Sequence, residues 1–146
     1  MSLFLTVQQD YVAALKAKEI IKKDILNYLF AQLKNKKIEL HRELKDDEVI
    51  QIIKKEIKMR QETISYAKQA GKDDEVSLEG EKIDVLETYL PKQLNEDELK
   101  ELVQQKINEL TITDLQKQKG QLIGIMMKEY GPQIDGSILQ KVINSL

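Results

Sequence analysis

Apolar residues recur every three or four positions along almost the whole chain, which is the spacing of one face of an α-helix. The repeat breaks at Gly71, Pro91 and Pro132, and glycine and proline both interrupt helices. The pattern therefore predicts four helices before Pro91 and three shorter ones after it. We expect an all-α fold, with an N-terminal helical domain over residues 1–92 and a small C-terminal domain over residues 93–146.

Capping residues indicate where several of these helices begin. Ser2 precedes the first apolar stripe and Asp135 precedes the last, and both residue types favour the first free N–H groups of a helix. After Pro91, Asn95 is followed by Glu98 at the spacing of a capping box, in which each side chain bonds the backbone N–H of the other residue. Thr113, with a glutamine three residues later, predicts a similar start for the sixth helix.

Two residues do not fit the apolar stripes. Arg60 falls in line with Ile57 and Ile64 on the stripe of the third helix. Gly80 lies inside the fourth helix, where glycine costs about 1 kcal/mol relative to alanine. The sequence gives no reason for Gly80.

Composition excludes several classes of site. Of the 146 residues, 41% are hydrophobic and 33% charged, and none is cysteine, so the chain has no disulfide, thiolate metal site or cysteine nucleophile. The single histidine, His41, lies among charged residues and is expected at the surface. No nucleotide-binding loop or nucleophile motif occurs. We predict no catalytic residue, no metal and no cofactor.

The first residues lack the features of a signal peptide, and no segment approaches the roughly 20 apolar residues of a membrane span. We therefore expect a cytoplasmic protein without membrane contact. Charge is unevenly distributed. Residues 1–72 carry 15 Lys and Arg against 10 Asp and Glu, and residues 73–146 carry 8 against 15. The basic half could attract an anionic partner, or its lysines could simply cover the solvent faces of helices.

One segment carries a family resemblance. Residues 87–99 read E-T-Y-L-P-K-Q-L-N-E-D-E-L and resemble the signature of the YqeY-like family. Further similarity covers residues 42–49 and 55–71. This family is related to the C-terminal tail of the B subunit of the glutamine-dependent amidotransferase that acts on mischarged tRNA. The resemblance implies a helical module that contacts tRNA and works with a tRNA amidotransferase or an aminoacyl-tRNA synthetase.

The sixth helix carries two glycines, Gly120 and Gly124, on one face, in a stretch similar to the glycine-containing pattern of the family. Either a neighbouring helix packs closely against them, or their backbone is open to a nucleic-acid sugar or phosphate. Around them and in the basic second helix, the candidate tRNA-binding residues are Lys22, Lys23, Lys117, Lys119, Gly120, Gln121, Gly124, Lys128, Gln133 and Lys141.

The chain departs from the family at two of these candidates. Gln121 stands where relatives usually have lysine, and Gln133 stands where they usually have arginine. The segment from residue 95 onward has a net charge of −2. Because phosphate contacts supply most nonspecific affinity for nucleic acids, the two glutamines lower the tRNA affinity expected of the tail. Basic helices of the N-terminal half could then contribute as much as the tail.

Three functions remain open at this stage. The first is a noncatalytic, tRNA-interacting module. The second is a component of a carbon–nitrogen ligase that uses glutamine as its amide donor, although no ammonia-releasing nucleophile or carboxylate-activating site is recognisable. The third is a protein-interaction adaptor without a nucleic-acid role, whose acidic stretch from Asp73 to Glu87 and basic helices dock charged partners.

Overall fold

In a computed structural model that describes residues 2–146, the regular elements are helices joined by short turns. The all-α prediction is confirmed. Contacts divide the chain into two compact units, unit 1 up to Leu90 and unit 2 over Pro91–Leu146. That residues 1–92 and 93–146 are separate domains stays a prediction, which separate expression of the two parts would test. Within the described residues, no helix is long and apolar enough to cross a membrane.

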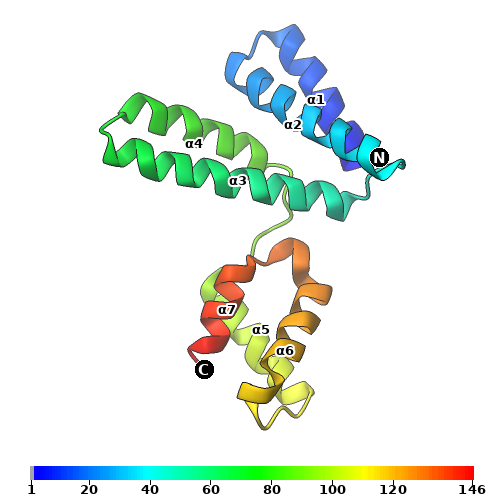
Figure 1. Cartoon of the computed structure of the whole chain (residues 1–146), viewed down its shortest axis with the longest axis vertical. Helices are drawn as coiled ribbons and strands as arrows, with labels where there is room; N and C mark the ends of the chain where they lie inside the picture. Colours follow the sequence, from blue (N-terminus) through cyan, green and yellow to red (C-terminus); the bar gives the residue numbers. More distant parts are fainter. Residues whose placement is uncertain (1) are drawn as a thin grey trace. The chain divides into compact units, whose positions relative to one another are not determined.

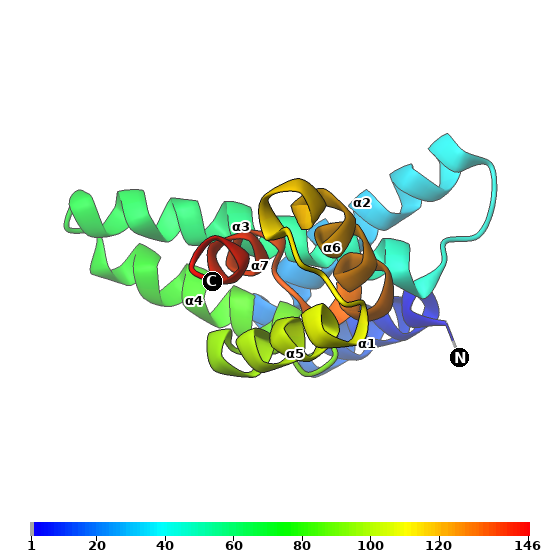
Figure 2. The ribbon, with the colours of Figure 1, turned by 90° about the horizontal axis from the view of Figure 1, so that it is seen from below.

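Unit 1 consists of two helical hairpins. Helices α1 (Leu3–Ala17) and α2 (Ile20–Leu40) form the first, and α3 (Asp46–Gln69) and α4 (Asp73–Glu87) form the second. In Figure 1 and Figure 2 the helices of each hairpin run antiparallel, side by side. The four helices share one core, to which α2 contributes Ile25, Leu26, Leu29 and Leu33. These four residues lie on more than one side of α2, because α2 packs against all three other helices of unit 1.

Local chemistry explains the ends of these helices. The Ser2 hydroxyl accepts a hydrogen bond from the Leu5 N–H at 3.2 Å, as the sequence predicts. The predicted break after α3 is also confirmed, since Gly71 has a φ of 71°. A residue with a Cβ atom is strained in that left-handed conformation, whereas glycine adopts it freely. His41 is exposed in the turn after α2.

Helix α4 ends earlier than Pro91 alone predicts. α4 stops at Glu87, and the next three residues form a turn in which the Tyr89 and Leu90 N–H groups bond to carbonyls three residues back. Tyr89 then reaches α1, where its hydroxyl donates a hydrogen bond to the Asp10 carboxylate. The chain leaves the helix before the proline because this turn and its contact with α1 compete with continued helix.

Unit 2 is built from α5 (Glu96–Glu109), α6 (Leu115–Tyr130), a 3₁₀ turn η1 (Gly131–Gln133) and α7 (Gly136–Asn144). α5 packs against α7, and both contact α6. The core residues of this unit are Leu99, Val103, Leu122, Met126, Ile134, Leu139, Val142 and Ile143.

Two of the three predicted caps in unit 2 are confirmed. Asn95 accepts a hydrogen bond from the Glu98 N–H at 2.8 Å, and Asp135 accepts one from Ser137 N–H at 2.8 Å. The Glu98 carboxylate, however, bonds the Asn95 side-chain amide rather than the backbone N–H of the predicted box. The Thr113 cap was wrong by one residue, since Asp114 caps α6 instead. Aspartate offers an anionic acceptor, which the free N–H groups of a helix start favour.

The linker after Pro91 is attached to unit 2. The Leu94 N–H donates to the Gln133 carbonyl at 2.9 Å, and the Gln93 side chain donates to the Pro132 carbonyl at 2.8 Å. The signature segment therefore lies beside the turn before the last helix. The sequence had singled out both parts of the chain. Their contacts are architectural, and they fix the entry of the chain into α5.

Candidate functional site

The outer face of α6 exposes bare backbone at two places. Gly120 and Gly124 are both solvent-exposed, and a Cβ atom built on either glycine would meet no heavy atom within 4 Å. Among the described residues of unit 2 no helix packs against them, so the close-packing alternative is wrong within this unit. Each glycine costs α6 about 1 kcal/mol of intrinsic helix stability relative to alanine. No atom of the described residues occupies the space that the missing side chains leave over the helix.

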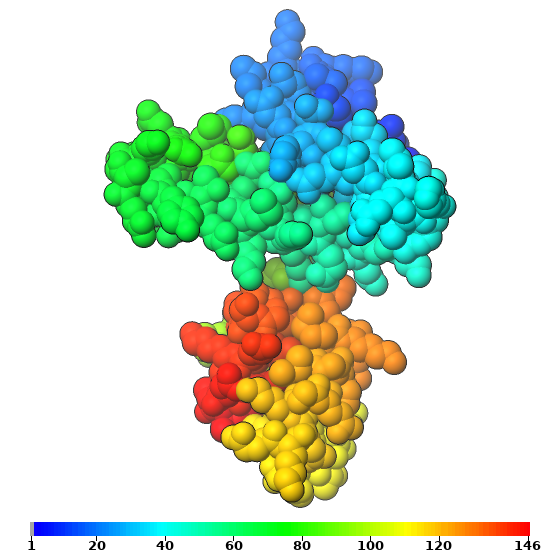
Figure 3. All heavy atoms as spheres, in the orientation of Figure 1, coloured from blue at the N-terminus to red at the C-terminus, as the bar shows by residue number. Residues whose placement is uncertain are grey.

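Lysines lie at both ends of this glycine face. Lys117, Gly120, Gly124 and Lys128 are spaced by three or four residues, which places them on one side of the helix. At 1.5 Å per residue, the backbones of Lys117 and Lys128 are about 16 Å apart. Both side chains are exposed, as is Gln121 between them. We call Lys117, Gly120, Gln121, Gly124 and Lys128 the glycine face, and the space-filling view shows the atoms of α6 in amber and orange at the surface of unit 2 (Figure 3).

The other tail candidates lie elsewhere. Lys119 points away from the glycine face and donates a hydrogen bond to Asn144, next to the end of α7. Lys141 of α7 forms an exposed 3.5 Å ion pair with Glu96 of α5. Gln133 is half-buried in η1, where its carbonyl holds the linker. The structure thus brings five of the eight predicted tail residues together and separates these three from them.

A carboxylate close in sequence to the glycine face is held on the opposite side. Glu129 follows Lys128, but its carboxylate lies 2.8 Å from Nζ of Lys106 on α5. Lys106 is almost fully buried, and its hydrogen bond to Glu129 raises the pKa of the Lys106 ammonium. The pair holds the one carboxylate of α6 against α5, so the glycine face carries two cations and one neutral amide, with the cap residue Asp114 next to Lys117.

Lys22 and Lys23 belong to unit 1, at the start of α2. Lys23 lies 3.7 Å from the Asp24 carboxylate, and Lys22 lines a shallow surface hollow together with Glu19 and Glu81. Carboxylates therefore accompany both lysines, which weakens the attraction of this region for an anion. These lysines belong to unit 1 and the glycine face belongs to unit 2.

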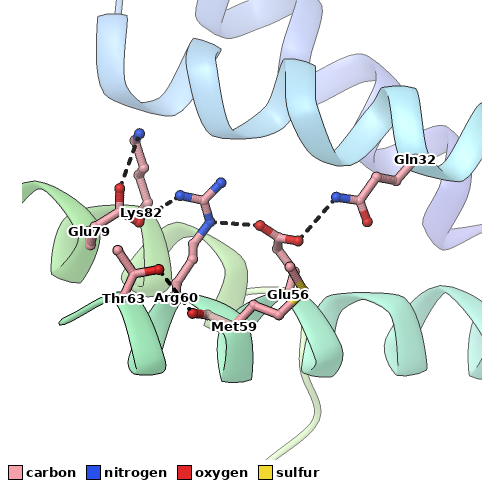
Figure 4. Close-up of polar contacts among 7 residues, drawn as sticks. All are labelled: Gln32, Glu56, Met59, Arg60, Thr63, Glu79 and Lys82. Atoms are coloured by element: carbon pink, nitrogen blue, oxygen red, sulfur yellow. Dashed lines mark hydrogen bonds and ion pairs between the residues drawn. The ribbon is translucent and has the colours of Figure 1, made fainter. Parts of the chain in front are cut away.

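A buried group of charges in unit 1 was only partly predicted from the sequence. Glu56 of α3 is 4% exposed; it accepts a hydrogen bond from Gln32 of α2 and forms a 2.9 Å ion pair with Arg60. Arg60 also donates to Glu79 of α4, which pairs with Lys82 (Figure 4). The helical spacing of the third helix placed Arg60 in line with Ile57 and Ile64. The other ion pairs of this group could have been found from the sequence by spacing, since Glu56 lies four residues before Arg60 and Glu79 lies three before Lys82.

This ion cluster of Glu56, Arg60, Glu79 and Lys82 contains two anions and two cations. Each carboxylate pairs with a cation, the ion pairs join α3 to α4, and the hydrogen bond from Gln32 to Glu56 links the cluster to α2. It is therefore a structural element of unit 1. Among residues 2–146, no group of three or more histidine, aspartate or glutamate side chains is arranged to hold a metal ion.

Comparison with known proteins gives one result. A search of curated proteins finds no match to this chain. The family model described as "Yqey-like protein" matches residues 5–146, which span both units, the signature segment and the glycine face. This chain therefore belongs to the YqeY-like protein family.

Proposed function

We propose that this protein is a noncatalytic helical module that binds tRNA through the glycine face of α6. The observation that carries the proposal is the pair of exposed glycines with empty space over them. Helical backbone without side chains allows a sugar or phosphate to approach the helix closely. Two lysines about 16 Å apart on the same face can then contact phosphates on either side of that approach.

The family relation supports tRNA as the nucleic acid. The YqeY-like family is related to the amidotransferase tail, and α6 carries the glycine pattern that the two have in common. On this basis we propose a tRNA amidotransferase or an aminoacyl-tRNA synthetase as the partner system. The glutamine at position 121 leaves the face with two lysines, so we expect binding that is weak at physiological salt and strong only at low salt.

Replacing either glycine with alanine should change folding stability and tRNA affinity in opposite directions. Because a Cβ atom meets nothing at either position, Gly120→Ala and Gly124→Ala should each raise the free energy of unfolding by about 1 kcal/mol. If a tRNA backbone approaches α6 closely, the same methyl groups should lower tRNA affinity. Gly80→Ala is the matched control, since Gly80 also has open space over it but lies on α4. It should stabilise the protein and leave tRNA affinity unchanged.

The measurement is a titration of tRNA by fluorescence anisotropy over a range of salt concentrations. Lys117→Gln and Lys128→Gln should each reduce the slope of log affinity against log salt by about 1. An affinity that is independent of salt, or no binding at low salt, would contradict tRNA binding. Equal affinities of wild type and both glycine variants would contradict the glycine face as its site. Release of ammonia from glutamine by the purified protein would contradict a noncatalytic role.

A further inference from the structure

A surface groove in unit 1 lies far along the chain from the glycine face and belongs to no site described above. It runs between the N-terminal half of α1 and the C-terminal half of α2, which lie side by side in Figure 1. Its apolar lining consists of Phe4 and Leu5 on α1 and Phe30 and Ile38 on α2. Phe4 and Phe30 belong to the core of unit 1, and their rings touch at a centroid distance of 5.4 Å.

The walls of this groove expose large apolar side chains. Leu5 is 45% exposed and Ile38 is 68% exposed. Val12 and Leu15 of α1 are exposed as well, with the polar side chains of Gln8 and Gln9 between them and Leu5. Exposed apolar side chains beside a groove favour contact with another molecule.

Two lysines border the apolar lining. Nζ of Lys34 lies 4.9 Å from the centre of the Phe30 ring, and Nζ of Lys37 lies 5.1 Å from the centre of the Phe4 ring. Each ammonium lies near an aromatic ring of the groove, and Lys34 is exposed to solvent. Lys37 pairs with Glu43 at 2.9 Å, but Glu43 is highly exposed, so a carboxylate from outside could replace it. Lys34 has no carboxylate within ion-pair distance among residues 2–146.

The backbone of both helices is already hydrogen-bonded, so an extended peptide would find no strand edge to extend. An amphipathic helix placed between α1 and α2 would instead bury its apolar face on Leu5 and Ile38. Carboxylates beside that face would meet Lys34 and Lys37. A nucleic acid fits less well, because the Phe4 ring is almost fully buried and lysine side chains cover the faces on which bases would stack.

We propose that this groove binds an acidic amphipathic helix of a partner protein. The proposal does not depend on tRNA binding, since it concerns residues of unit 1 alone. It assigns recognition to Leu5 and Ile38 through apolar burial and to Lys34 and Lys37 through charge.

The test uses the full chain and a fluorescent helical peptide of about 15 residues, long enough to form a helix. Its apolar face carries leucine and phenylalanine at helical spacing, and glutamates flank that face. One matched peptide has lysine in place of the glutamates, and another has serine in place of the apolar residues. The glutamate peptide should bind in a salt-dependent way, and each matched peptide should bind at least about tenfold more weakly.

Two substitutions locate the binding site. Ile38→Glu and Lys34→Glu should each weaken binding of the glutamate peptide by about tenfold or more. Tyr66→Glu and Lys58→Glu are matched controls on exposed positions of α3 outside the groove lining, and should leave the affinity unchanged. Since Ile38 and Lys34 are exposed, the variants should keep the circular dichroism spectrum of the wild type.

Three results would overturn the proposal. The first is no detectable binding of the glutamate peptide at low salt. The second is equal binding of the glutamate and lysine peptides, which would indicate unspecific apolar contact. The third is a loss of tRNA affinity in Lys34→Glu with unchanged peptide affinity, which would assign the groove to nucleic acid.

Discussion

The Tyr89 hydroxyl donates a 2.7 Å hydrogen bond to the Asp10 carboxylate. The two residues are 79 positions apart, and the bond joins the turn after α4 to the middle of α1. Burial of the ring, together with the anionic acceptor, raises the pKa of the Tyr89 phenol. The tyrosine of the family signature therefore closes unit 1, while Gln93 and Leu94 of the same segment hold unit 2.

Tyr89→Phe should lower the free energy of unfolding by about 1 to 2 kcal/mol, because it leaves the Asp10 carboxylate without its donor. Urea denaturation followed by circular dichroism measures this loss. Tyr66→Phe is the matched control, since Tyr66 is 72% exposed and should tolerate the change. Equal stability of the two variants would contradict the role assigned to Tyr89.

Gly71 and Gly80 should respond to alanine in opposite directions. Gly80 is helical with open space over it, so Gly80→Ala should stabilise the protein by about 1 kcal/mol. Gly71 has a φ of 71°, so Gly71→Ala should destabilise it by a similar amount, although its surroundings are equally open. The midpoints of urea denaturation compare the two variants directly. If both midpoints shifted in the same direction, backbone conformation would not determine the effect of alanine at these two positions.

Arg60 should be the residue of the ion cluster whose loss is most damaging. Arg60→Met leaves the buried Glu56 carboxylate without its cation, and removal of one partner from a buried ion pair costs about 3 kcal/mol. Adding Glu56→Gln should recover part of this loss, because a neutral amide is easier to bury than a carboxylate. Lys36→Met, at the exposed pair with Glu39, serves as the control and should change stability by less than about 1 kcal/mol.

Acid should weaken the start of α3. Hydrogen bonds from the Arg42 guanidinium lower the pKa of Glu48 from 4.5 to about 2. The unfolded chain therefore takes up this proton at higher pH than the folded one, so the contribution of Glu48 to stability is fully present above pH 4.5 and falls as the pH drops toward 2. Glu48→Gln should lack this part of the acid dependence. If the free energies of unfolding of the variant and the wild type fell in parallel between these pH values, the role assigned to Glu48 would be contradicted.

The sequence predicted local features better than relations between distant ones. Stripes such as Leu3, Val7 and Tyr11 identify helices because each depends only on residues a few positions away. The early end of α4 could not be predicted, since it involves the pairing of Tyr89 with Asp10. The pairing of Arg60 with Glu79 was missed for the same reason, because Glu79 comes from another helix, α4.

In the candidate site, too, local features could be predicted and contacts between distant residues could not. Spacing alone placed Gly120 and Gly124 on one face of a helix and left the lysines around them unassigned to a face. It could not decide between a packed and an open glycine pair, since that depends on where α5 and α7 lie. The list of candidates included Lys119, although a residue two positions from Lys117 lies on another side of the helix, where its side chain donates a hydrogen bond to Asn144.

The exposed glycines of α6 also affect how often this helix opens. Its backbone hydrogen bonds around residues 120–124 have no side chains over them on the outer face, and glycine lowers the stability of each turn. Amide hydrogens there should exchange with solvent deuterium faster than those of α5, which has no glycine. A molecule bound on this face would cover these amides, so slower exchange in α6 would report its presence without any substitution in the chain.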